Sequence, residues 1–209
     1  LDRRGHLAGL AHAEAHHGPP IANQSSRVDA RLLGMYIFIA SETMLFGSFF
    51  SIYFFDRVVV GGGEPWPPEG YELPVYLALV NTIILVTSSF SMHWALQSLK
   101  RSNRSGLIAG LTLTFLLGLT FLLIQAREYT RIGFGPSDNA FASTFFGLTG
   151  LHGAHVFVGL NLLLYALIRS TRGHYGPKAE DHLGVELPGI YWHFVDVMWI
   201  VVYTTVYVL

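Results

Sequence analysis

The sequence predicts an all-helical membrane protein in which five transmembrane helices form a bundle. Hydrophobic residues make up 51% of the chain and charged residues only 13%. An average soluble domain carries about 25% charged residues, so this chain has too few charges to cover a soluble surface. Five apolar runs are each long enough to cross a bilayer, which needs about 20 residues as a helix. A helix is expected for each run, because backbone groups in lipid must be hydrogen-bonded within their own segment.

The apolar runs define the expected elements and divide the chain into two parts. Residues 1–31 form a polar, His-rich N-terminal tail, and residues 32–209 form the transmembrane domain. The fourth run is the longest, so we expect it to tilt or to project beyond the bilayer. Segments rich in Gly, Pro and polar residues separate the runs, as expected for loops. In chain order the runs are Leu32–Phe55, Val75–Leu96, Leu107–Gln125, Ala140–Ile168 and Ile190–Leu209.

The distribution of Lys and Arg predicts how the helices are oriented. If the N-terminus is cytoplasmic, the inner segments hold ten basic residues and the outer segments hold three. Such an excess on the cytoplasmic side is typical of membrane proteins. The N-terminus is therefore expected inside and the C-terminus outside. The three outer residues are Arg57, Arg127 and Arg131.

The chain contains no cysteine. This composition excludes disulfides, thiolate-ligated haem, iron–sulfur clusters and a copper site built on paired thiolates. Any metal bound by this chain would need His, Asp or Glu ligands.

Glu42 is the most informative single residue, because it lies in the middle of the first apolar run. At 1.5 Å per residue it is roughly 15 Å from the start of that run, about halfway through the hydrocarbon core. Ionisable groups at that depth are costly and usually mark a function. Two interpretations remain open: a neutral carboxyl that hydrogen-bonds between helices, or a group that organises lipid or influences proton entry.

Other polar residues lie within or at the ends of the predicted spans. His152 and His155 are three residues apart, so they share a helix face and could bind one metal. Contacts between helices are the preferred interpretation, because glycines nearby allow close packing and polar groups then hydrogen-bond across it. We predict the same structural role for His193, Asp196 and Glu128, and we predict neither a catalytic residue nor a metal site.

Several segments resemble subunit III of the haem–copper respiratory oxidases, and most closely its cytochrome c oxidase branch. They occur in the order and at the spacing of that family. Because two spans that precede the first motif in the longer members are not seen here, the chain resembles the short, five-helix bacterial form. The segments are HHGPP at His16–Pro20, SETMLFGSFF around Glu42, WPPEG at Trp66–Gly70, QAREY at Gln125–Tyr129 with the following STFFGLTGLHGAHVFVG, HLGVE at His182–Glu186, and YWHFVDVMW at Tyr191–Trp199.

The resemblance implies an accessory subunit without redox centres. It also implies a multi-pass protein of the bacterial cytoplasmic membrane. Its implied partners are subunit I, which carries haem and copper, subunit II, and cytochrome c as electron donor to the complex. Phospholipid is an implied ligand, and no nucleic-acid partner is expected. By resemblance, Glu42 lines the lipid region, His16 lies beside inner headgroups, and Arg169 and His174 contact lipid phosphate. In the family this subunit sustains turnover and proton uptake.

Two alternatives stay open at the level of the sequence. The chain could serve a quinol oxidase or a nitric-oxide-reductase-type complex, which also have five-helix versions of this subunit. A stand-alone proton-coupled transporter that uses Glu42 is a weaker alternative, because such proteins usually show an internal repeat or broken helices. Neither feature is evident in this chain.

Overall fold

The computed structural model describes residues 29–175 and 179–209. The chain divides into two units, Leu1–Gly34 and Met35–Leu209, and the architecture below is that of the second unit. The described residues form long helices joined by loops, without a strand. Five of these helices are long and apolar enough to cross a membrane. The prediction of an all-helical chain with five membrane spans is confirmed.

The helices are longer than the apolar runs that predicted them. Four of the five exceed the predicted bounds by a few residues, because a helix continues past the last apolar side chain into the polar boundary region. The last helix departs most, since it begins at Ala179 and not at the predicted Ile190. The helices are α3 (Ala30–Phe55), α4 (Val75–Lys100), α5 (Arg104–Tyr129), α6 (Ala140–Thr171) and α7 (Ala179–Tyr203), with one π-helical turn after α3 (η1, Asp56–Val60) and one after α7 (η2, Thr204–Val208).

Asparagine side chains define the starts of two helices. The Asn103 carbonyl oxygen accepts from the Gly106 N–H at 3.0 Å, and the Asn139 carbonyl oxygen accepts from the Ala142 N–H at 2.8 Å. These bonds satisfy donors that have no partner inside the helix. At the other end of α6, Gly173 adopts a φ of 77°, a left-handed conformation that favours glycine and ends the helix.

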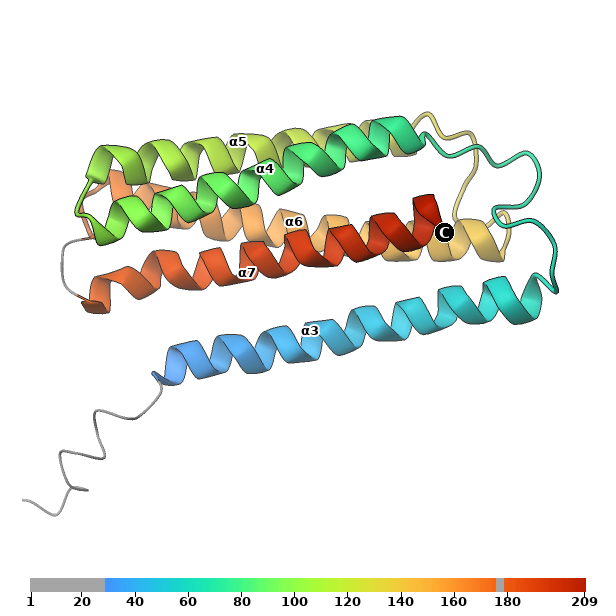
Figure 1. Ribbon diagram of the computed structural model, residues 1–209, viewed down its shortest axis with the longest axis horizontal. Helices are drawn as coiled ribbons and strands as arrows, with labels where there is room; N and C mark the ends of the chain where they lie inside the picture. The colour runs from blue at the N-terminus through green and yellow to red at the C-terminus, as the bar shows by residue number, and fades with distance from the viewer. Residues whose placement is uncertain (1–28, 176–178) are drawn as a thin grey trace, which may run out of the picture. The chain divides into compact units, whose positions relative to one another are not determined.

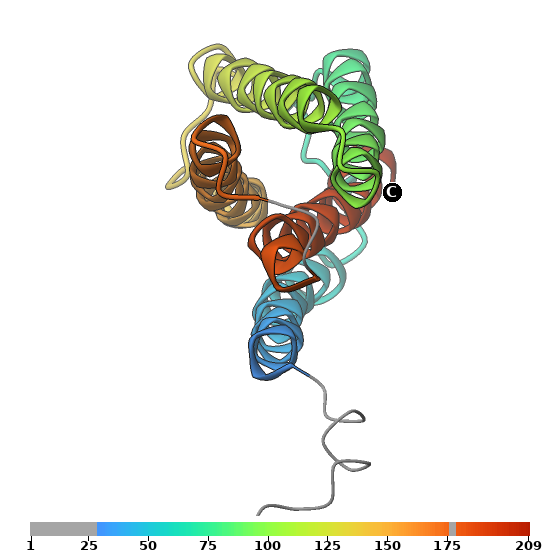
Figure 2. The ribbon, with the colours of Figure 1, turned by 90° about the vertical axis from the view of Figure 1, so that its left-hand side faces the viewer.

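Helices α4 to α7 form a closed ring, which Figure 2 shows from one end. Each helix contacts the next in sequence, and α7 returns to contact α4. The largest buried side chains of the interior are Trp192 and Trp199, both fully buried on α7. Trp192 fits because α5 and α6 carry glycine where they approach it: an added Cβ would lie 2.4 Å from the indole at Gly118 and 2.8 Å from it at Gly159.

Helix α3 lies outside this ring and runs alongside α7 in Figure 1. Aromatic pairs join the two helices, with Phe38 and Tyr191 ring centroids 6.1 Å apart and those of Phe46 and Phe194 6.3 Å apart. Only 11% of the most apolar window of this span is buried, against 33–56% for the other four spans. Most apolar side chains of α3 therefore face outward, toward lipid or a neighbouring chain.

Pro188 lies inside α7 without ending it. A proline has no backbone N–H, so the carbonyl of Gly184, four residues earlier, loses its partner within the helix. The Tyr175 hydroxyl donates to this carbonyl at 3.2 Å. A Cβ at position 184 would lie 2.6 Å from the Tyr175 ring, so the absent side chain of Gly184 makes the contact possible. The early start of α7 thus depends on a bond from the loop after α6.

Candidate functional site: a carboxylate–imidazole pair between membrane helices

The candidate site is centred on Glu42 of α3 and His155 of α6. The Glu42 Oε2 atom lies 2.9 Å from the His155 Nε2 atom. The side chains are 19% and 10% exposed, so the pair is largely enclosed but reachable from the outer surface of the bundle. The structure thus joins two of the residues that the sequence analysis singled out, across 113 positions of the chain.

The hydrogen bond of His155 Nδ1 determines how many protons Glu42 and His155 hold between them. His155 Nδ1 lies 2.8 Å from the Leu151 carbonyl oxygen. A carbonyl oxygen only accepts, so Nδ1 carries a proton and donates it. The contact between Nε2 and Glu42 then holds one further proton, either on the carboxyl or on the imidazole. The pair is neutral overall in both arrangements, which lowers the cost of placing it in a membrane interior.

Aromatic rings enclose the pair on the side of the bundle. The ring of Phe46 is 4.9 Å from the His155 imidazole, and that of Phe194 is 6.4 Å from it. The Tyr191 hydroxyl donates to the backbone carbonyl of His155 at 3.3 Å. These neighbours come from α3 and α7, so three helices fix the position of one imidazole.

His193 and Asp196 lie on α7 and both face Ser89 of α4. The Ser89 Oγ atom is 3.0 Å from His193 Nδ1, and the Ser89 hydroxyl donates to the Asp196 carboxylate. Two more bonds join the same helices, from the Trp192 indole to Ser88 and from the Trp199 indole to Thr82, each 2.9 Å. Four hydrogen-bond contacts therefore link α4 to α7.

His152 of α6 and Glu128 of α5 are both buried in the interior. His152 is fully buried, with its ring 4.7 Å from the Trp199 indole. The Glu128 Oε1 atom accepts from the Tyr207 hydroxyl at 3.1 Å. His152 and His155 do not form a shared ligand set, because both nitrogens of His155 are engaged with protein groups. Among the side chains that the structure describes, no three His, Asp or Glu residues converge on a metal-binding position.

Arg169 and His174 lie together at the end of α6. The His174 N–H donates to the Arg169 carbonyl at 3.2 Å. The Arg169 guanidinium is stacked over the rings of Tyr165 and Tyr175, at 5.8 and 5.5 Å. Burial raises the pKa of the Tyr175 hydroxyl, and the Arg169 charge opposes this shift. Arg169 is fourteen residues beyond His155 on α6, roughly 21 Å at about 1.5 Å per residue, so this group is distinct from the Glu42 pair.

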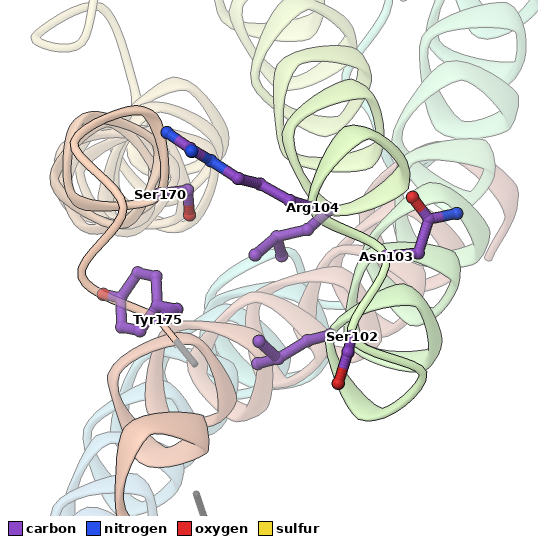
Figure 3. A pocket seen from close by; sticks show the side chains of 7 residues that line it. Ser102, Asn103, Arg104, Ser170 and Tyr175 are labelled. Atoms are coloured by element: carbon purple, nitrogen blue, oxygen red, sulfur yellow. The ribbon is translucent and has the colours of Figure 1, made fainter. Parts of the chain in front are cut away.

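A small cavity of about 100 Å³ lies at the same end of the bundle. Figure 3 shows Arg104 extending from the start of α5 toward α6, with Ser170 and Tyr175 on the far wall. The Arg104 guanidinium donates to the Thr171 carbonyl at 2.6 Å. Cationic side chains from two helices therefore flank the end of α6.

The predicted lipid contact at His16 lies outside the described residues.

Sequence reasoning missed the neutral partners of these charged groups. Ser89, Tyr191 and Tyr207 hold the singled-out residues in place, yet hydroxyl groups are common in membrane helices and give a weak signal. Only the run Thr87-Ser88-Ser89 inside the second apolar segment was a recognisable cue, since three consecutive hydroxyl residues are uncommon in a lipid-facing stretch.

Comparison with known proteins identifies the family to which these features belong. Residues 21–209 match the family model described as Cytochrome c oxidase subunit III. The chain belongs to the cytochrome c oxidase subunit III family. The resemblance carried by the sequence motifs is confirmed. Subunit III belongs to an oxidoreductase of aerobic respiration, a membrane-bound haem–copper oxidase complex with other subunits.

The relatives cover most of the chain at about two-fifths identity. Cytochrome c oxidase subunit 3 of Thermostichus vulcanus is 42% identical over 182 residues, which is 87% of this chain and 88% of that protein. The Synechocystis sp. protein of the same name is 41% identical over 94% of this chain and 80% of its own length. The Homo sapiens protein is 38% identical, with coverage of 93% and 73%.

Proposed function

We propose that this chain is the non-redox accessory subunit III of a proton-pumping cytochrome c oxidase in a bacterial cytoplasmic membrane. It packs against the catalytic subunit I, with subunit II in the same complex and cytochrome c as the electron donor. Haem and copper belong to those partners. This chain binds phospholipid and sustains turnover and proton uptake by the complex.

The observation that carries this proposal is that His155, His193 and Asp196 each contact other polar groups of the protein. Both nitrogens of His155 contact protein oxygens, at 2.8 and 2.9 Å. Asp196 and His193 both face Ser89 of the neighbouring helix. Groups that already have such partners stabilise a scaffold and do not form an open ligand set. A scaffold subunit is the role that this arrangement supports best.

The exposed face of α3 supports packing against another membrane subunit. Phe46 and Tyr53 are the buried side chains of this helix. Large apolar residues such as Ile37 and Met44 are 63% and 75% exposed. In a membrane such a surface is covered by lipid or by a second chain. Glu42 lies on the same helix, so this helix places the carboxylate–imidazole pair close to whatever covers α3.

The cationic end of α6 supports a phospholipid headgroup site. Arg169, His174 and Arg104 gather there, beside the cavity lined by Ser170 and Tyr175. Guanidinium groups bind phosphate with charge-assisted hydrogen bonds. With the predicted orientation this end faces the cytoplasm, where anionic lipids attract basic side chains.

Purification of the intact complex from its native membrane tests the accessory role. We expect the chain to copurify with a haem-bearing subunit and the complex to oxidise cytochrome c faster than quinol. After separation in mild detergent, this chain should show no haem absorbance and no stoichiometric metal. Haem or metal retained by the separated chain through His152 and His155 would overturn the proposal.

Arg169→Ala tests the phospholipid site. We expect the variant complex to retain less anionic phospholipid in native mass spectrometry, because the guanidinium that faces the headgroup is lost. Arg172→Ala is the matched control, since Arg172 lies at the same end of α6 and is exposed. Equal lipid content in the two variants would contradict a specific site at Arg169.

A further inference from the structure

A groove of about 630 Å³ lies where α4 begins and α5 ends. Figure 1 shows these two helix ends side by side at one end of the bundle. The end of α6 that carries Arg169 lies at the opposite end, because α5 and α6 cross the bundle in opposite directions. The groove is therefore distinct from the headgroup site proposed at Arg169.

Two guanidinium groups line the groove. Arg127 lies in the last turn of α5, and Arg131 follows it by about one helical turn, with its backbone N–H donating to the Glu128 carbonyl at 2.9 Å. Both arginines are exposed, and neither forms an ion pair with a carboxylate of the described residues. A guanidinium presents a fork of N–H donors that matches the oxygens of a phosphate. This part of the groove therefore suits a phosphate group.

Carboxyl groups line the same groove. Glu72 is exposed in the loop before α4, whereas Glu128 is only 3% exposed and its Oε1 atom accepts from the Tyr207 hydroxyl at 3.1 Å. An anionic headgroup would meet these carboxyl groups as well as the arginines. A zwitterionic headgroup offers a phosphate to the arginines and an amine to a carboxylate. Charge complementarity therefore favours a ligand that carries both signs.

The lining also distinguishes between two kinds of amine. A quaternary ammonium is typically bound by a cage of aromatic rings. No aromatic side chain is among the described residues that line this groove. A primary ammonium instead donates hydrogen bonds, which a carboxylate such as that of Glu72 accepts. The groove therefore fits a primary amine better than a choline group.

The rest of the groove is apolar and continues toward the membrane interior. Leu77 in the first turn of α4 and Ile124 near the end of α5 both line it. Leu77 is 43% exposed, and Val80, three residues further along the same side of α4, is 53% exposed. Charged groups at the end of the bundle are thus followed by apolar side chains along the spans. This order matches a lipid, whose acyl chains need an apolar surface below the headgroup, and not a free phosphate compound.

We propose that this groove binds one phospholipid with an ethanolamine headgroup, in the leaflet opposite to the cationic end of α6. Arg127 and Arg131 bind its phosphate, and Glu72 accepts hydrogen bonds from its ammonium group. Its acyl chains lie along Leu77 and Ile124.

Photolabelling of the intact oxidase complex tests the proposal. The probe is phosphatidylethanolamine with a diazirine near the glycerol end of one acyl chain, added to nanodiscs of phosphatidylcholine that hold the purified complex. We expect crosslinks in the peptides that contain Leu77 or Ile124. Unlabelled phosphatidylethanolamine should compete about tenfold better than phosphatidylglycerol, the difference expected for one charge-assisted hydrogen bond. Equal competition by the two lipids, or the absence of label from both peptides, would overturn the proposal.

Two glutamates of the same loop supply a matched pair of variants. Glu72 lines the groove, whereas Glu69, three residues earlier, is exposed and is not part of the lining. Glu72→Gln should lose the roughly tenfold preference for ethanolamine over glycerol headgroups, and Glu69→Gln should keep it. Arg127→Ala should weaken competition by both lipids, because both carry the phosphate. An unchanged preference in Glu72→Gln, or cryo-electron microscopy density for a neighbouring subunit inside the groove, would overturn the assignment.

Discussion

At the scale of single residues, the contact between Glu42 and His155 explains how an ionisable carboxyl group is accommodated inside the membrane. Each residue alone would leave a polar group without a partner in an apolar setting. Together they share a proton across 2.9 Å and are neutral overall. The pair therefore stabilises the contact of α3 with α6.

Two substitutions of Glu42 distinguish the effect of losing the hydrogen bond to His155 from the effect of losing the shared proton. We expect Glu42→Ala to assemble with the partner subunits but to lower the stability of this chain by about 1–3 kcal/mol, because His155 Nε2 loses its partner. Glu42→Gln should keep near-native stability, since its amide can donate to the same nitrogen. Denaturant unfolding in detergent measures both values.

The same two variants test the proposed role in turnover. We expect both to shorten the number of turnovers before the oxidase loses activity, because neither can hold the shared proton. A Glu42→Gln enzyme as durable as the unsubstituted one would assign the pair a contact role only. Complete loss of the complex in Glu42→Ala would assign Glu42 to packing.

Depth in the membrane was enough to single out Glu42 from the sequence, whereas its partner was not predictable. Hydropathy places a residue along a helix axis but gives no rotation between helices far apart in the chain. For the same reason Ser89 and Tyr207 were missed as partners of Asp196 and Glu128. Pairing across helices depends on how the helices pack against one another in three dimensions, which a single sequence does not encode in any short pattern.

At the scale of elements, the packing of α5, α6 and α7 depends on the indole of Trp192. Gly118 and Gly159 lie against opposite parts of the ring, and an added methyl group would overlap it at both positions. Small residues at such contacts allow membrane helices to approach closely. The glycines are therefore structural requirements of the ring.

Gly118→Ala should destabilise the subunit by about 1–3 kcal/mol, the usual cost of overpacking a filled interior. Gly47→Ala on α3 is the control, because an added Cβ there has no atom within 4 Å. Thermal unfolding of the two variants in the same detergent measures the difference. Trp192→Phe should recover part of the loss in Gly118→Ala, and no recovery would contradict the overlap with the indole.

Tyr175 and Pro188 should behave as a coupled pair. Tyr175→Phe removes the donor to the Gly184 carbonyl and should cost about 1 kcal/mol. In a Pro188→Ala background the new backbone N–H at position 188 can satisfy that carbonyl, so Tyr175→Phe should cost little. A double-mutant cycle on unfolding free energies measures the coupling. Equal costs in both backgrounds would contradict this account of how α7 starts.

The number and class of the helices were predictable from hydropathy, but their ends were not. Apolar length detects the part of a helix that lies in hydrocarbon, and α3 to α6 extend only slightly beyond it. α7 begins eleven residues before the predicted Ile190, in a polar segment that contains Pro188. The hydrogen bond from Tyr175 to the Gly184 carbonyl compensates for this proline, and no local sequence pattern predicts that bond.

At the scale of the whole molecule, the asymmetric charge of the loops predicts one orientation in the membrane. Because the chain has no cysteine, single substitutions can report on it directly. Glu64→Cys should react with a membrane-impermeant maleimide in intact spheroplasts. Ser105→Cys should react only after the membrane is permeabilised. Both positions are exposed in the structure. The reverse labelling pattern would contradict a cytoplasmic N-terminus.

The hydrogen bonds between α4 and α7 have a consequence for biosynthesis. Thr82, Ser88 and Ser89 leave the ribosome long before the segment that contains Trp192, Asp196 and Trp199. During this interval the hydroxyl groups of α4 lack the α7 side chains to which they hydrogen-bond in the folded subunit. The nascent chain therefore depends on the insertion machinery to keep these groups out of lipid. A premature stop after Thr171 would make this interval permanent, so a truncated product is a natural target for membrane quality-control proteases.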